Sequence, residues 1–104
     1  MKEKLLIVDD EVSICTSLRF ALEDRYDVST ADCAAEGLRK FQEDSYSLCL
    51  IDLKIGEVNG IELLEKIKAL DESVIVIMIT AYASIQSSVE AIKKGAYTYL
   101  TKPL

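Results

Sequence analysis

Five polar side chains that could together bind and transfer a phosphoryl group stand at the ends of short apolar segments. They are the carboxylates of Asp9, Asp10 and Asp52, the hydroxyl of Thr80 and the ammonium of Lys102. Two carboxylates about 4 Å apart repel each other by roughly 4 kcal/mol at an effective dielectric of about 20, so such a cluster needs protons or a cation. Magnesium prefers oxygen ligands and can keep a position open for a phosphate oxygen. The set therefore predicts a magnesium site that binds a phosphoryl group.

The chemistry predicted for this set is nucleophilic attack on phosphorus. A carboxylate beside bound magnesium can act as the nucleophile and form an aspartyl phosphate. The Thr80 hydroxyl, the backbone amide of Ala81 and the Lys102 ammonium would then bind the phosphoryl oxygens. Taken singly, each residue has an ordinary explanation, because either of the paired aspartates could cap a helix and the later one could occupy a turn. Their shared position after four different apolar segments favours one common site.

The apolar segments alternate with segments of helical periodicity along the chain. Runs typical of strands occupy Leu5–Val8, Tyr26–Ala31, Leu48–Ile51, Val74–Ile79 and Ala96–Leu100. Helical spacing marks Val12–Leu22, Ala34–Glu43, Ile61–Leu70 and a segment from Ile85 that closes at Lys93–Gly95. This alternation predicts an α/β fold with a doubly wound, five-stranded parallel sheet and helices on both faces. Polar residues that follow the strands then meet at one edge of the sheet, where such folds bind ligands.

Length and composition narrow the classes of function. The 104 residues are enough for one domain, and the net charge of −6 argues against direct partners that are nucleic acids or anionic membranes. The longest apolar run has six residues, too few to span a bilayer, and the charged start is unlike a signal peptide. With no histidine and three cysteines that lack CxxC spacing, a zinc site is not expected. We expect a single cytoplasmic domain.

The ordered set of motifs resembles the receiver domains of two-component response regulators, in the CheY-like superfamily. The matching segments are Ile7–Glu11, Ile51–Asp52, Asn59–Gly60, Ile79–Ala81 and Tyr99–Pro103. They extend over essentially all 104 residues, and the last quarter of the chain looks most like receivers of NtrC-like transcription activators. The resemblance implies the flavodoxin-like strand order 2-1-3-4-5.

The resemblance also assigns a metal-binding and phosphoacceptor site. Asp52 would be the phosphoacceptor, and Asp10 and Asp52 would bind Mg²⁺ directly. The backbone carbonyl of Lys54 would be the third protein ligand, and Asp9 would hold the ion through water. For Glu11, favourable electrostatics at the start of a helix is a better explanation than metal binding.

The resemblance also implies roles for the residues that contact the phosphoryl group, and it implies binding partners. Thr80 would be the switch hydroxyl, Lys102 would pair with the phosphate, and Tyr99 would turn inward on activation. The Lys102–Pro103 peptide would be cis. The family implies a sensor histidine kinase as donor, an output domain or downstream protein as receiver of the signal, and allows a homodimer. It implies a switch that catalyses its own phosphorylation and dephosphorylation rather than a turnover enzyme.

Two departures from the family pattern qualify these expectations. Gly56 and Glu57 stand where the family usually has proline and glycine, so we expect a looser loop after the acceptor and a further carboxylate near the site. The chain also stops at Leu104, before the usual fifth helix, which predicts a truncated domain with one sheet face covered by the first helix alone. Lys54 and Tyr82 flank the site and are expected to tune the lifetime of the phosphoryl group.

Three other functions fit the sequence less well. A pseudo-receiver that binds partners without phosphorylation would normally lack the acceptor or the lysine, and both Asp52 and Lys102 are present. An aspartate-nucleophile phosphatase of the haloacid-dehalogenase type needs an acid two residues after its nucleophile, but Lys54 follows Asp52 at that spacing. After Asp9 the corresponding residue is Glu11, without the expected threonine. A dinucleotide-binding domain would need GxGxxG after the first strand, which is absent.

Overall fold

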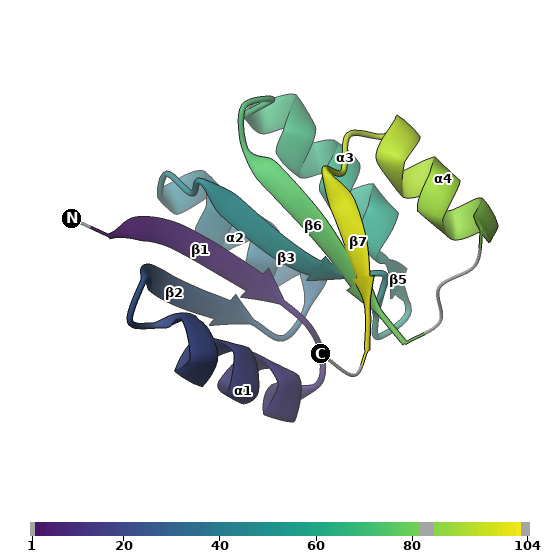
Figure 1. Cartoon of the computed structure of the whole chain (residues 1–104). Coiled ribbons are helices and arrows are strands. Elements are labelled where there is room, and N and C mark those ends of the chain that lie inside the picture. The colour runs from purple at the N-terminus through teal and green to yellow at the C-terminus, as the bar shows by residue number, and fades with distance from the viewer. Residues whose placement is uncertain (1, 82–84, 103–104) are drawn as a thin grey trace.

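The computed structural model describes residues 2–81 and 85–102, and Figure 1 labels its elements. In chain order they are β1 (Glu3–Val8), α1 (Val12–Leu22), β2 (Tyr26–Ala31), α2 (Ala34–Glu43), β3 (Leu48–Asp52), β4 (Lys54–Ile55), β5 (Val58–Asn59), α3 (Gly60–Leu70), β6 (Ile75–Thr80), α4 (Ile85–Lys93) and β7 (Thr98–Thr101). Among these residues no helix has the length and apolar character needed to cross a membrane. The predicted elements are confirmed, with shifts of one or two residues at several ends.

The main sheet has five parallel strands in the order β2-β1-β3-β6-β7. Because β6 and β7 are the fourth and fifth strands of this sheet along the chain, the order is the predicted 2-1-3-4-5. Strand β1 pairs with β2 on one side and β3 on the other, so the strand order reverses between β1 and β3. The register aligns Val8 with Ile51, which brings the carboxyl ends of β1 and β3 together. Ligands bind at this point in doubly wound sheets.

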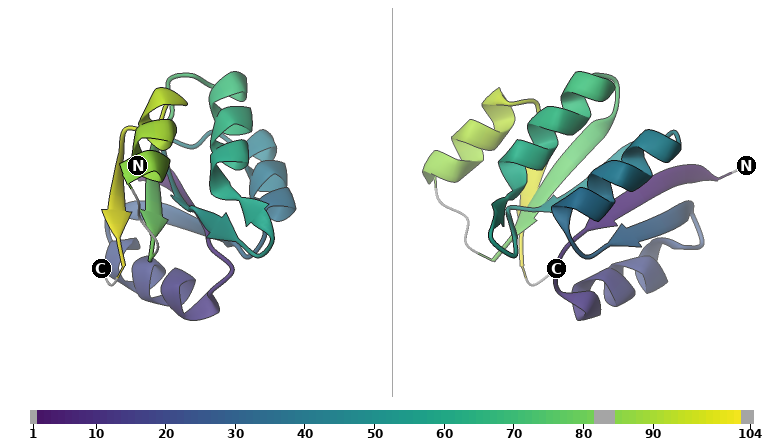
Figure 2. Two further views of the ribbon diagram at one scale, coloured as in Figure 1. Left: turned by 90° about the vertical axis from the view of Figure 1, so that its right-hand side faces the viewer. Right: turned by 180° about the vertical axis from the view of Figure 1, so that it is seen from behind.

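Helices cover both faces of the sheet, as Figure 2 shows. Helices α2, α3 and α4 contribute to one buried cluster, which includes Phe41, Leu64 and Ala91. Helix α1 packs on the other face through Cys15 and Leu18, against alternate residues of the central strands. The residues Leu5–Val8 of β1 are fully buried, since both faces of this strand are covered.

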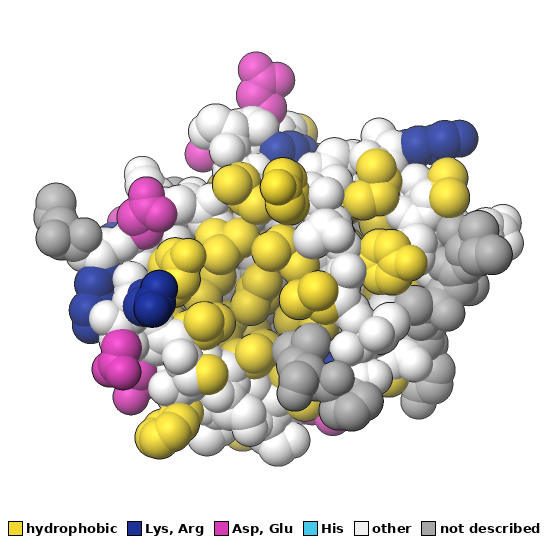
Figure 3. Space-filling view, viewed as in Figure 1, with side chains coloured by type: hydrophobic (Ala, Val, Ile, Leu, Met, Phe, Trp, Pro, Cys, Tyr) yellow, Lys and Arg dark blue, Asp and Glu magenta, His cyan; other side chains and the backbone are white. Residues whose placement is uncertain are grey.

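The face of the sheet that carries α1 also exposes apolar side chains. Ile75 is 46% exposed and Leu100 is 44% exposed, and both project on the side of Ile79, which belongs to the α1 cluster. Figure 3 shows apolar side chains gathered over the strands of this face. In the described part of the chain, α1 is the helix that packs on this face.

The segment after β3 differs from the expected loose loop. Strands β4 and β5 pair antiparallel, with Lys54 opposite Asn59 and Ile55 opposite Val58. Gly56 begins the two-residue turn with a φ of +60°, a conformation that proline cannot adopt. Glycine therefore permits a paired hairpin here instead of loosening the segment.

The start of α3 is packed directly against the end of β3. The Asn59 side chain caps the helix by accepting a hydrogen bond from the N–H of Ile61, at 2.9 Å. The N–H of Gly60 donates to the carbonyl of Leu53 at 2.6 Å. A Cβ atom at Gly60 would lie 2.0 Å from the backbone oxygen of Asp52, so only glycine fits without a backbone shift. This close approach fixes the backbone at the end of β3.

Candidate functional site

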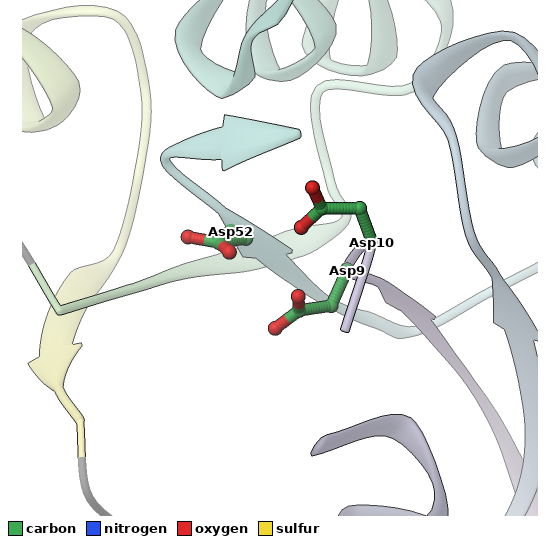
Figure 4. A group of neighbouring side chains, drawn as sticks. All are labelled: Asp9, Asp10 and Asp52. Carbon is green, nitrogen blue, oxygen red and sulfur yellow. The ribbon is translucent and has the colours of Figure 1, made fainter. Parts of the chain in front are cut away.

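Three carboxylates meet where β1 and β3 end. Asp9 and Asp10 follow the last residue of β1, and Asp52 is the last residue of β3. Each offers a carboxylate oxygen, and these oxygens all lie within 4.8 Å of one another. Figure 4 shows the three side chains extending from the two strand ends into a shared space. Asp9 and Asp52 are buried and Asp10 is exposed, so the cluster lies partly within the protein and opens to solvent on one side.

Lys102 brings an ammonium into this cluster from the segment after β7. Its Nζ lies 2.9 Å from Oδ2 of Asp9, 3.1 Å from Oδ2 of Asp52 and 3.1 Å from Oε1 of Glu11. The backbone N–H of Lys102 donates to the carbonyl of Thr80, which extends the pairing of β6 with β7 up to the lysine. Burial opposes its charge, but the hydrogen bonds to the carboxylates prevail and raise the pKa of Lys102. The lysine is therefore firmly cationic.

The surroundings of Asp52 disfavour the charged form of its carboxylate. Burial raises the pKa of Asp52, and the nearby charge of Asp9 acts in the same direction, against the hydrogen bond from Lys102. Its Oδ1 also accepts a hydrogen bond from the N–H of Lys54, at 3.3 Å. Because Asp9 and Asp52 share the one charge of Lys102, a further cation beside them would be stabilised.

Asp9 has an oxygen that points to the same conclusion. Its Oδ1 accepts a hydrogen bond from the N–H of Glu11, at 2.9 Å. Its Oδ2 is buried and forms an ion pair with the ammonium of Lys102, at 2.9 Å. The single charge of Lys102 is shared among Asp9, Glu11 and Asp52, so it does not balance the carboxylates around it. Clustered carboxylate oxygens with excess negative charge fit a hard divalent ion such as Mg²⁺.

A depression of about 200 Å³ lies over the cluster. It is lined by Asp10, Glu11, Asp52, Lys54, Ala81 and Lys102. Thr80 is buried at the end of β6 and does not line the depression, although it directly precedes Ala81, which does. Of the predicted metal-binding residues, Asp10, Asp52 and Lys54 line this depression, whereas Asp9 is buried beneath it.

Tyr99 lies apart from the acidic depression. It is 38% exposed and lines an apolar hollow of about 390 Å³ together with Val89 and Ile92 of α4. The predicted aromatic switch residue therefore faces α4. Two other predictions, the cis Lys102–Pro103 peptide and the role of Tyr82, involve residues outside the described ranges.

The sequence did not reveal two contacts at this site. Glu11 is the N-cap of α1 but makes no capping hydrogen bond with its side chain, which pairs with Lys102 instead. The N–H of Gly56 donates to Oδ2 of Asp10 at 3.0 Å. The position of Glu11 directly after Asp9 and Asp10 was a signal for the first contact, whereas the second depends on the β4–β5 hairpin.

The fold and this cluster can be compared with known proteins. Residues 5–104 match the family described as the response regulator receiver domain. The chain belongs to this family. Receiver domains are phosphorylation-dependent signalling switches rather than turnover enzymes. The acidic cluster at the carboxyl edge of the sheet is consistent with membership of this family.

Among sequence relatives, the receiver domain is similar to two transcriptional regulators. It is 41% identical over 101 residues to the transcriptional regulatory protein ZraR of Escherichia coli K12. The aligned residues make up 96% of this chain and 23% of ZraR. It is 39% identical over 101 residues to the alginate biosynthesis regulator AlgB of Pseudomonas putida, with 96% of this chain and 22% of AlgB covered. The chain thus spans less than a quarter of these curated relatives.

Solved structures agree closely with the receiver domain. A CheY-like receiver from Methanospirillum hungatei superposes with a TM-score of 0.96 at 39% identity, over 100% of this chain and 84% of that one. A response regulator from Burkholderia pseudomallei that carries a phosphorylated aspartic acid and a calcium ion has a TM-score of 0.94 at 31% identity. That match covers 99% of this chain and 61% of the other. The beryllofluoride-activated dimer of the NtrC4 receiver domain has a TM-score of 0.91 at 36% identity, and the match covers 97% of this chain and 84% of the other.

Proposed function

We propose that Asp52 accepts a phosphoryl group from the phosphohistidine of a sensor histidine kinase, in the cytoplasm. A carboxylate oxygen of Asp52 forms the new O–P bond while the P–N bond to the donor breaks, and the imidazole leaves. The observation that carries this proposal is the position of Asp52 at the carboxyl edge of the sheet. A carboxylate oxygen of Asp52 lies within 4.8 Å of carboxylate oxygens of Asp9 and Asp10, and its Oδ2 lies 3.1 Å from the ammonium of Lys102. A nucleophile beside clustered carboxylates and a fixed cation is suited to phosphoryl transfer.

The same residues define a proposed site for magnesium. Asp10, Asp52 and the backbone carbonyl of Lys54 would bind Mg²⁺, with Asp9 holding it through water. The three clustered aspartate carboxylates, which share the single charge of Lys102 with Glu11, support a further cation at this position. When bound, the ion would neutralise carboxylate charge and the charge of the phosphoryl oxygens.

Three groups in or next to the depression would bind the transferred phosphoryl group. Lys102 would pair with one oxygen, which requires its ammonium to exchange a carboxylate for the phosphoryl group. The backbone amide of Ala81, which lines the depression, and the hydroxyl of Thr80 would bind others. Because Thr80 is buried and does not line the depression, its engagement would move the end of β6 toward the site.

Tyr99 would carry this movement to the surface. It lies on β7, beside β6, where its neighbour across the pair is Met78, and it faces the apolar hollow against α4. A shift at Thr80 would repack Tyr99 and change the face formed by α4 and β7. We propose that this face signals to an output domain or downstream protein in transcription regulation, or to a second copy of the domain, as the NtrC4 receiver dimer suggests.

The test is intact-mass measurement after incubation with acetyl phosphate, with and without magnesium, on the wild-type chain and Asp52→Asn. We expect one magnesium-dependent phosphoryl adduct on the wild type and none on Asp52→Asn. An adduct that persists in Asp52→Asn would place the acceptor elsewhere. No adduct on a folded, magnesium-binding protein would favour a pseudo-receiver that binds its partners without phosphorylation.

A further inference from the structure

The turn of the β4–β5 hairpin touches the acidic cluster through a single backbone group. The pairs Lys54–Asn59 and Ile55–Val58 leave a two-residue turn, Gly56–Glu57. Gly56 has a φ of +60°, and no non-glycine residue in the described ranges has a positive φ. A glycine with positive φ at the first turn position is typical of the tight hairpin turns that match strand twist. The turn therefore has a defined conformation, which aims the N–H of Gly56.

This N–H is directed at a carboxylate from a distant part of the chain. It donates to Oδ2 of Asp10 at 3.0 Å, across a separation of 46 residues. Asp10 is exposed, so without such a donor its side chain would be free to rotate. A hydrogen bond to an ionised carboxylate is stronger than one between neutral groups and holds the acceptor in one orientation.

We propose that Gly56 is a positioning residue for Asp10, an inference that rests on the proposed function of the site. The hairpin begins with Lys54, whose carbonyl is the proposed third metal ligand, and ends its first strand just before Gly56. The Gly56 N–H therefore ties together two ligands that come from separate segments, one after β1 and one after β3. Holding both in place before the ion arrives reduces the ordering cost of binding.

Proline at this position could not act in the same way. It has no N–H to donate, and its ring fixes φ at about −65°, far from the conformation of Gly56. In addition, a Cβ built on Gly56 meets no atom within 4 Å, so no steric demand explains a glycine here. The requirements that remain are the positive φ and the N–H that it aims at Asp10.

The first experiment measures amide hydrogen exchange by NMR on the magnesium-free protein, for the wild type and Asp10→Ala. We expect the Gly56 amide to exchange about tenfold faster in Asp10→Ala, because its acceptor is removed. The amide of Gly95, which donates to the carbonyl of Ile92 at 3.1 Å, is the internal reference and should keep its rate. An unchanged Gly56 rate would overturn the proposal. Since neither metal nor phosphoryl donor is present, failure of the proposed phosphorylation would leave this result intact.

The second experiment compares magnesium binding, followed by NMR chemical shifts, in the wild type, Gly56→Pro and Gly56→Ala. Alanine keeps the N–H at the cost of a strained φ, whereas proline removes it. We expect the dissociation constant for Mg²⁺ to rise about tenfold in Gly56→Pro, as when other supporting hydrogen bonds to metal ligands are lost, and by less than about threefold in Gly56→Ala. Equal weakening in both variants would show that the turn conformation matters and the hydrogen bond does not.

Discussion

The ammonium of Lys102 lies 3.1 Å from Oδ2 of Asp52, although 50 residues separate them in the chain. The parallel pairing of β3 with β6 and of β6 with β7 brings them together, since each residue follows or ends a strand at the same edge. The lysine side chain is 8% exposed and also contacts Asp9, so this cation is shared between two buried carboxylates. Its removal has consequences for stability as well as for phosphoryl transfer.

Lys102→Ala should lower the free energy of unfolding of the magnesium-free protein at neutral pH by about 2 kcal/mol, because it leaves two buried carboxylates without their cation. This is less than for a fully buried pair, since the site opens to solvent. Urea denaturation in the presence of a chelator measures it. The matched control is Lys4→Ala, which removes an exposed ion pair with Asp44 and should have a much smaller effect. Equal losses in the two variants would contradict the prediction.

The stability contributed by Asp52 should depend on pH with an unusual sign for an aspartate. Burial raises the pKa of Asp52 above its usual 3.8, so the folded protein binds more protons than the unfolded chain between the two values. Stability then falls as pH rises through the folded pKa, and Asp52→Asn removes this loss. Relative to wild type, Asp52→Asn should therefore gain stability as pH rises above 3.8 and through the raised pKa of Asp52. Urea denaturation at several pH values, without metal, measures the difference.

Asp44 provides a control of opposite sign for this experiment. The hydrogen bond from Lys4 holds the pKa of Asp44 below its usual range, so its contribution is present at neutral pH and is lost as pH falls. Asp44→Asn should thus lose stability relative to wild type as pH rises to about 3.8, and the difference should change little above that value. If both substitutions followed the same trend, a general charge effect would explain the data better than the burial of Asp52.

These electrostatic details explain why the sequence predicted the site only in part. The apolar run Leu5–Val8 and the acids after it indicated a buried strand ending at a ligand-binding edge, and the structure confirms this. By contrast, nothing local distinguishes Asp9, which is fully buried, from Asp10, which is exposed. That difference arises from where the chain turns after β1, which depends on the packing of α1.

The contacts that the sequence missed share a physical reason. The pairing of Glu11 with Lys102 spans 91 residues and depends on the completed sheet order, whereas the helix-start explanation for Glu11 was local. Strands β4 and β5 have two residues each, too few for any periodicity to appear. The hydrogen bond between Gly56 and Asp10 follows from that hairpin and was equally invisible.

Magnesium should stabilise the folded domain through the proposed ligands. At about a hundred times its dissociation constant, it should raise the free energy of unfolding by about 2.7 kcal/mol. Asp10→Ala should lose most of this gain, because it removes a direct ligand. Thermal denaturation across a magnesium titration measures both. Asp71→Ala is the control, since Asp71 caps the distant end of α3 and should leave the gain unchanged. A similar gain in all three proteins would show that the ion acts elsewhere.

Gly56 in the hairpin turn and Gly60 directly after the hairpin should respond very differently to alanine. In Gly60→Ala the new Cβ would lie 2.0 Å from the backbone oxygen of Asp52, so β3 or α3 must move, and we expect a loss of about 3 kcal/mol in the free energy of unfolding. In Gly56→Ala the Cβ meets no atom within 4 Å, and the positive φ alone costs about 1 kcal/mol. Urea denaturation gives both values, and the NMR shift of the Asp52 amide should move clearly only in Gly60→Ala. Comparable losses, with an unmoved Asp52 amide in both, would mean that the close packing of α3 against β3 does not hold the acceptor in place.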